Sequence, residues 1–140
     1  MTSSTTDFLA IGRRVIRRES EALDILADTL DGGFSAAVDL ILQAQGRVIV
    51  CGMGKSGHIA RKIAATFAST GTPAQFVHPG EASHGDLGMV TESDVALVLS
   101  NSGETPELAD IIAHTRRFGI PLIGVAGREG STLLLSLIHI

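Results

Sequence analysis

A strand-like run that breaks into closely spaced glycines is the feature that most constrains this chain. Residues 48–51 are apolar and favour β structure, and residues 52–57 read Gly-Met-Gly-Lys-Ser-Gly. Beyond residue 58, apolar side chains recur four positions apart, as they do along one face of a helix. A strand, a glycine turn and a helix bring free backbone N–H groups against a bound anion. The sequence therefore predicts an anion-binding turn, with Gly54, Lys55 and Ser56 as candidate contacts.

Two nucleotide-binding motifs share this outline. The dinucleotide fingerprint G-x-G-x-x-G also needs an acidic residue about 20 positions on, at the end of the second strand, to hold a ribose. Here the second strand ends at His78, and the nearest acid is Glu81, beyond a Pro-Gly pair. A phosphate-binding P-loop needs a glycine five residues before Gly54, where Ile49 stands. The sequence therefore disfavours a nicotinamide-dependent oxidoreductase and excludes a P-loop.

A second polar loop, residues 100–105, points to a phosphate ligand. It follows a continuous apolar run at residues 95–99, which is typical of a strand covered on both faces. Pro106 suits the first turn of a following helix. Serine and threonine hydroxyls together with loop amides suit a phosphate monoester, although helix capping by Ser102 or Thr105 would explain this loop taken alone. The candidate contacts are Ser100, Asn101, Ser102, Gly103, Glu104 and Thr105.

The order of elements predicts an α/β fold. Two helices come first, at residues 8–30, capped by Thr6 or Asp7, and at residues 34–44. Strands and helices then alternate, which predicts a parallel sheet flanked by helices, in a three-layer, flavodoxin-like arrangement. The expected strands lie at residues 48–51, 74–78, 95–99 and 121–126, with one helical turn within residues 79–85. We divide the chain into an N-terminal helical segment (1–33), a ligand-binding domain (34–133) and an apolar tail (134–140).

Composition limits the classes of partner. The 140 residues suit one domain. The net charge is −4, and positive and negative side chains are interspersed along the sequence without forming a basic stripe, so we expect no nucleic-acid partner. No segment reaches the roughly 20 apolar residues of a membrane span, so we expect no membrane partner. The single cysteine, Cys51, lies in a predicted buried strand; it excludes an intrachain disulfide and fits a cytoplasmic protein.

The motif Ser-x-Ser-Gly-x-Thr at residues 100–105 resembles the signature of sugar isomerase (SIS) domains, which bind phosphosugars. The segments 52–58, 65–73, 76–82 and 84–91 are similar to the bacterial arabinose 5-phosphate isomerases. Those enzymes interconvert D-ribulose 5-phosphate and D-arabinose 5-phosphate, at the entry to Kdo and lipopolysaccharide synthesis. The resemblance implies an SIS-type fold, a homotetramer and a pentose 5-phosphate substrate, with no required cofactor.

The resemblance also implies the catalytic groups. The family's catalytic lysine falls on Lys55 and one catalytic glutamate on Glu107. Aldose–ketose isomerisation needs a base near C1 and C2 and a donor for the developing oxyanion, which these groups can supply. Without the resemblance, Glu107 reads equally well as a first-turn glutamate favoured by the helix dipole.

Further contacts rest on the same resemblance. Substrate contacts fall on Gly71, Thr72 and His84, and a metal-associated histidine falls on His78. A zinc site needs three or four ligands, so His78 would need partners such as His84, Glu81 or a neighbouring subunit. We therefore expect zinc at His78 only if further ligands complete the site.

The resemblance ends near Leu133. The family's second catalytic glutamate, its late histidine, the end of the SIS domain and the usual CBS pair lie in sequence that this chain lacks. We therefore expect a truncated chain, incomplete at its C-terminus, with weak isomerase activity or none. The alternative is a regulatory SIS module that binds a phosphosugar without catalysis.

Overall fold

The computed structural model describes residues 7–136, and the chain divides into two compact units with their boundary between Phe34 and Ser35. The first unit is built on the helix α1 (Phe8–Thr29). Asp7 caps it, because its carboxylate accepts a hydrogen bond of 2.9 Å from the N–H of Ala10. Asp7 is thus confirmed as one of the two expected caps, and Thr6 lies outside the described residues. No residue of α1 is buried within this chain.

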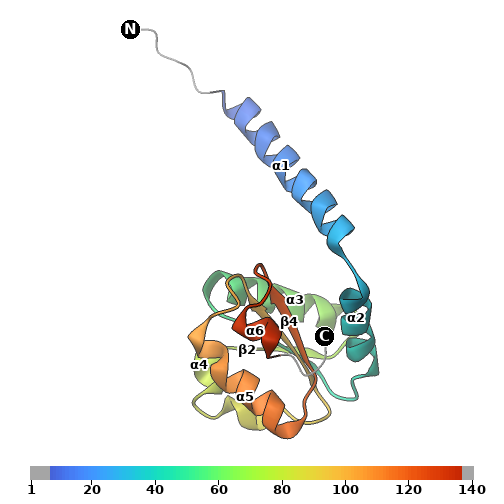
Figure 1. Cartoon of the computed structure of the whole chain (residues 1–140), viewed down its shortest axis with the longest axis vertical. Coiled ribbons are helices and arrows are strands. Elements are labelled where there is room, and N and C mark those ends of the chain that lie inside the picture. Colours follow the sequence, from blue (N-terminus) through green and yellow to red (C-terminus); the bar gives the residue numbers. More distant parts are fainter. Residues whose placement is uncertain (1–6, 137–140) are drawn as a thin grey trace. The chain divides into compact units, whose positions relative to one another are not determined.

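The second unit is built on a parallel sheet of four strands within the described residues (Figure 1). The strands are β1 (Val48–Gly52), β2 (Ala74–Val77), β3 (Val95–Ser100) and β4 (Leu122–Ala126). Their order is β2-β1-β3-β4, and every neighbouring pair is parallel. This order is the flavodoxin-like one, so the predicted fold class and all four predicted strands are confirmed.

Helices cover both faces of the sheet. The helix α3 (Gly54–Ser69) and the second half of α2 (Gly32–Gln43) pack against one face, over Val50 and Leu97. The opposite face, with Ile49 and Val98, is covered by α4, η1, η2, α5 and α6. These elements are α4 (Pro79–Ala82), η1 (Asp86–Met89), η2 (Pro106–Leu108), α5 (Ala109–Phe118) and α6 (Thr132–Leu135). Strands buried on both faces explain the continuous apolar runs in the sequence.

Two details follow from this packing. Cys51 is fully buried in β1, as predicted, and burial raises the pKa of its thiol to about 12. Leu133 is also fully buried, in the layer of α5, so the apolar run after Thr132 begins as a packed helical turn. Of the predicted tail 134–140, Leu135 is 74% exposed, and residues 137–140 lie outside the described part. Within residues 7–136, no helix combines the length and the apolar character needed to cross a bilayer.

A polar cluster ties together the chain segments at the amino ends of the strands. The carboxylate of Asp94 accepts hydrogen bonds from the backbone N–H groups of Arg47 (2.7 Å) and Thr91 (2.9 Å). The Arg47 guanidinium reaches the same carboxylate at 3.4 Å and donates to the carbonyl oxygen of Met89. Burial alone would raise the pKa of Asp94, but these hydrogen bonds outweigh it, so its pKa is lowered. The ionised carboxylate is therefore the form that stabilises the fold.

We expect the substitution Asp94→Asn to lower the free energy of unfolding by about 2 kcal/mol near neutral pH, because an amide cannot accept all these bonds. The folded pKa lies below the ordinary value of 3.8, so this stabilisation is present above that value and is lost as the pH falls through the folded pKa. Urea unfolding at several pH values measures it. The exposed neighbour Glu92→Gln is the control, and a difference between wild type and Asp94→Asn that stays constant down to pH ~2 would contradict the assignment.

Candidate functional site

The two polar loops predicted to bind phosphate lie side by side at one edge of the sheet. The strands β1 and β3 are neighbours, and Gly52 at the end of β1 pairs with Leu99 near the end of β3. From β1 the chain moves outward to β2, and from β3 it moves outward to β4 on the other side. The carboxyl ends of β1 and β3 therefore flank the point where the strand order reverses, which is where open α/β sheets bind ligands.

The glycine turn brings the start of α3 very close to the end of β1. A Cβ atom added at Gly57 would lie 2.6 Å from the carbonyl oxygen of Gly52, and one added at Gly52 would lie 3.0 Å from the backbone of Ser56. Met53, the N-cap residue of α3, makes no side-chain capping bond. The N–H groups of the first turn thus have no partner within the helix, as at any helix start. Lys55 is exposed and Ser56 half-buried in this turn, so charge, hydroxyl and amides are available to an anion.

In the second loop, one hydroxyl shapes the backbone and another is exposed. Ser100 is buried; its hydroxyl accepts from the N–H of Gly103 at 3.0 Å and lies 2.8 Å from the hydroxyl of Thr105. Ser102 is exposed and accepts from the N–H of Glu104 at 3.2 Å. Thr105 precedes η2 without making a side-chain capping bond. Helix capping by Thr105 therefore does not explain this loop, and Ser102 is the hydroxyl most open to a ligand.

The two glutamates of this region differ in their surroundings. The carboxylate of Glu104 accepts from the N–H of Thr132 at 3.0 Å and from its hydroxyl, and the Arg128 guanidinium is 4.0 Å away. These hydrogen bonds lower the pKa of Glu104. Glu107, the predicted catalytic carboxylate, is exposed in the first turn of η2, directly after the second loop, and its catalytic role stays a prediction.

The predicted metal residue lies at the same edge, after β2. His78 caps α4, and its Nδ1 accepts from the N–H of Gly80 at 3.1 Å, which leaves Nε2 for a metal. His84 is exposed in the turn after α4. In the described part of the chain, no three His, Cys, Asp or Glu side chains gather closely enough to hold a metal ion. Zinc at His78 therefore remains a prediction that needs ligands from elsewhere.

Gly71 and Thr72 lie at the other end of the strands, beside the amino end of β1. The N–H of Thr72 donates to the carbonyl oxygen of Phe67 at 2.9 Å, and the N–H of Val48, the first residue of β1, donates to Pro73 at 2.8 Å. The five residues of β1 separate this turn from the two loops by about 16 Å. Gly71 and Thr72 line a separate surface cavity of about 190 Å³. The structure thus does not bring them together with Lys55 and Ser102 in one chain.

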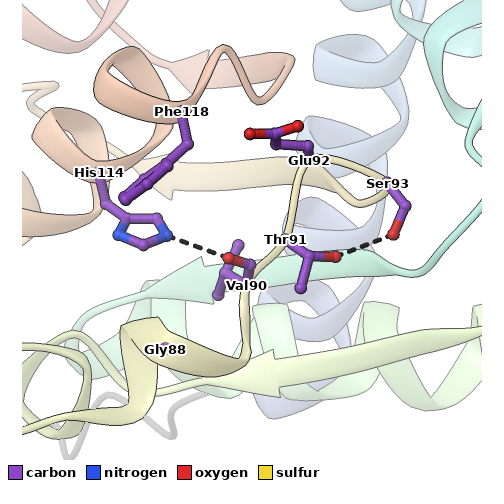
Figure 2. A pocket seen from close by; sticks show the side chains of 7 residues that line it. All are labelled: Gly88, Val90, Thr91, Glu92, Ser93, His114 and Phe118. Carbon is purple, nitrogen blue, oxygen red and sulfur yellow. Dashed lines mark hydrogen bonds between the residues drawn. The ribbon is translucent and has the colours of Figure 1, made fainter.

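A second cavity, of about 440 Å³, also lies toward the amino ends of the strands (Figure 2). The imidazole of His114 lies at its wall, with Nε2 3.1 Å from the carbonyl oxygen of Val90, and the ring of Phe118 stands beside it. We call it the His114 cavity; it is lined by Gly88, Val90, Thr91, Glu92, Ser93, His114 and Phe118. None of the predicted site residues is among them. Its position before β3, at the amino ends of the strands, sets it apart from the switch point.

The loop after β4 lies against the second polar loop, and the sequence reasoning did not identify it. The N–H of Gly127 donates to the carbonyl oxygen of Asn101 at 3.1 Å, and the N–H of Leu133 donates to that of Gly103 at 3.0 Å. The signal was present, because residues 127–132 are polar and glycine-containing and follow a fourth parallel strand. The rule that located the first two loops would have placed this third one beside them.

The family model described as "SIS domain" matches residues 40–136. The chain belongs to the SIS domain family. The chain is 50% identical over 131 residues to the arabinose 5-phosphate isomerase KdsD of Pseudomonas aeruginosa, covering 94% of this chain and 40% of that protein. It is 51% identical over 127 residues to the protein of the same name from Escherichia coli O157:H7, covering 91% and 39%. The predicted resemblance is thus confirmed.

A solved structure agrees with these relatives. The chain superimposes on the E. coli CFT073 protein c3406 in complex with arabinose 5-phosphate, with a TM-score of 0.89 and 40% sequence identity, covering 98% of this chain and 73% of that one. The chain spans about 40% of the length of the curated relatives it matches.

Proposed function

We propose that this SIS domain binds a pentose 5-phosphate and that its protein interconverts D-ribulose 5-phosphate and D-arabinose 5-phosphate. The observation that carries the proposal is the adjacency of the glycine turn and the Ser100–Thr105 loop at the switch point of the sheet. The names of the curated relatives and the arabinose 5-phosphate complex of the similar structure support this substrate. Kdo and lipopolysaccharide synthesis, named by the resemblance, is the pathway we propose.

The proposed chemistry divides three tasks among groups of this chain: holding the phosphate, moving the proton and stabilising the enediolate. The amides of the α3 start and the Ser102 hydroxyl hold the phosphate, because charged acceptors form the strongest hydrogen bonds. Glu107 acts as the base that moves a proton between C1 and C2, or as the partner of that base. Lys55 stabilises the negative charge of the enediolate oxygen. Neither a metal nor a cofactor is part of this step.

We expect Ser102→Ala to weaken binding of arabinose 5-phosphate by about 1–3 kcal/mol, the range for a hydrogen bond to a charged group. Ser102 is exposed, so the fold should be retained. Calorimetric titration measures the affinity, and the control is Ser35→Ala, which removes an exposed hydroxyl of α2, outside the two loops. An unchanged affinity for Ser102→Ala, with the fold intact, would refute the assignment of this loop. Because this chain alone is expected to have weak isomerase activity or none, binding without ketose formation by a chain extended through the full SIS domain is the result that would favour the regulatory alternative.

We also propose that copies of the chain associate through α1, toward a tetramer. The helix exposes large apolar side chains, among them Ile16 (68%) and Leu23 (66%), and such surfaces mark interaction sites. Light scattering of the wild type should give a mass above the monomer, and Ile16→Asp should lower it, whereas Arg14→Asp on the opposite face of the same helix should not. A monodisperse wild-type monomer would contradict this proposal. A cytoplasmic location is a further part of it, supported by the single free cysteine Cys51.

A further inference from the structure

We propose that the loop after β4 is a clasp that sets the shape of the phosphate loop, and that Glu104 is a positioning residue rather than a substrate contact. The clasp is defined as residues 127–133, and the phosphate loop as residues 100–105. The inference rests on the proposed function, because it concerns the loop assigned there to the phosphate.

The two segments are joined by hydrogen bonds at Asn101, Gly103 and Glu104 of the phosphate loop. The clasp donates two backbone hydrogen bonds to the phosphate loop, from Gly127 to Asn101 (3.1 Å) and from Leu133 to Gly103 (3.0 Å). Leu133 is fully buried in the core, so the clasp is fixed to the body of the domain at that end. A loop held at two carbonyl oxygens by a fixed segment keeps its exposed groups in place before a ligand arrives, which lowers the entropy lost on binding.

Close packing adds to these bonds. Gly103 has a positive φ of 68°, and Ser131 of the clasp is fully buried against the position that a Cβ atom of Gly103 would occupy. Within residues 7–136, the hydroxyl of Ser131 is a buried side-chain oxygen without a hydrogen-bond partner. The contact between Ser131 and the phosphate loop is therefore one of packing against Gly103. The glycine in the phosphate loop is required by the clasp as well as by the turn.

The carboxylate of Glu104 is hydrogen-bonded to the clasp. It accepts from both the N–H and the hydroxyl of Thr132, at the start of α6, and lies beside the guanidinium of Arg128. A carboxylate turned toward a phosphate dianion would instead repel it. Glu104 thus acts on the ligand through Thr132 and the loop backbone, and Ser102 and the amides remain as the groups that touch phosphate.

The test uses the full chain and two readouts. Calorimetry measures the affinity for arabinose 5-phosphate, and amide hydrogen exchange without ligand measures protection at Gly127 and Leu133. We expect Glu104→Ala to weaken binding about tenfold, which is about 1.4 kcal/mol, and to speed exchange at both amides. Glu104→Gln keeps an acceptor for Thr132 and should stay within about threefold of wild type. Glu129→Ala removes an exposed carboxylate of the clasp and is the control.

Thr132→Val separates positioning from direct contact. It removes the hydroxyl bond to Glu104 and keeps the bond from its backbone N–H, so it should weaken binding less than Glu104→Ala does, and adding it to Glu104→Ala should cause no further loss. Additive losses in the double variant would mean that Glu104 touches the substrate. Unchanged exchange in Glu104→Ala would overturn the clasp. If wild type fails to bind arabinose 5-phosphate, the proposed function fails, and the exchange rates still decide whether the clasp exists.

Discussion

Replacing Gly103 by alanine is expected to abolish phosphosugar binding. The backbone of Gly103 has φ of +68°, where an alanine is strained, and its Cβ would overlap the Ser131 side chain. Strain and overlap together cost about 3 kcal/mol, and the loop can relieve them only by leaving the clasp. Calorimetry should show an affinity for arabinose 5-phosphate reduced by about 100-fold or more.

Gly130→Ala provides the matched control for this change. Gly130 has the same φ of +68°, but no heavy atom lies within 4 Å of the position of an added Cβ. It therefore carries the backbone strain without the overlap, and we expect a stability loss of about 1 kcal/mol with affinity close to wild type. If Gly103→Ala binds as tightly as Gly130→Ala, the contact between Gly103 and Ser131 has no part in the site.

Gly57→Ala is expected to destabilise the domain and to displace the start of α3. An added Cβ would lie 2.6 Å from the carbonyl oxygen of Gly52, a backbone atom that cannot move without bending β1. Overpacking a core costs about 1–3 kcal/mol, and a rigid backbone contact belongs at the upper end. Urea denaturation should show about 3 kcal/mol lost from the free energy of unfolding.

Gly12→Ala is the matched control, because it makes the same glycine-to-alanine change in a helix where the added Cβ has no close neighbour. Gly12 lies in α1 with no heavy atom within 4 Å of an added Cβ, so Gly12→Ala should leave stability unchanged or raise it by up to about 1 kcal/mol. Gly57→Ala with wild-type stability would show that the helix and strand are not in the close contact on which the glycine turn depends.

Much of the fold follows from local pattern. The apolar runs at residues 48–51 and 95–99 predicted two strands covered on both faces, and the structure has them as neighbours in the sheet. Alternating strands and helices imply a parallel sheet, and a parallel sheet places the ends of its strands at one edge. The adjacency of the glycine turn and the Ser100–Thr105 loop could therefore be predicted without coordinates.

The division of roles within the site could not be predicted, because it depends on partners far along the chain. Glu104 has the residue type of a ligand contact, yet its carboxylate bonds to Thr132, 28 positions away. Ser100 has the same hydroxyl as Ser102 but is buried within the loop. Sequence shows which groups are present and leaves open where each one points. The resemblance also groups Gly71 with Lys55; within one chain these positions lie at opposite ends of β1, so that grouping stays a prediction.

The most direct test of the central claim is amide chemical-shift mapping of the wild-type chain titrated with arabinose 5-phosphate. If the site lies at the carboxyl ends of β1 and β3, the largest shifts will fall on residues 54–56 and 101–105. D-arabinose without phosphate, and NAD, should leave these amides unchanged at the same concentrations. Shifts concentrated around the His114 cavity, or no shifts at saturating arabinose 5-phosphate, would contradict the account.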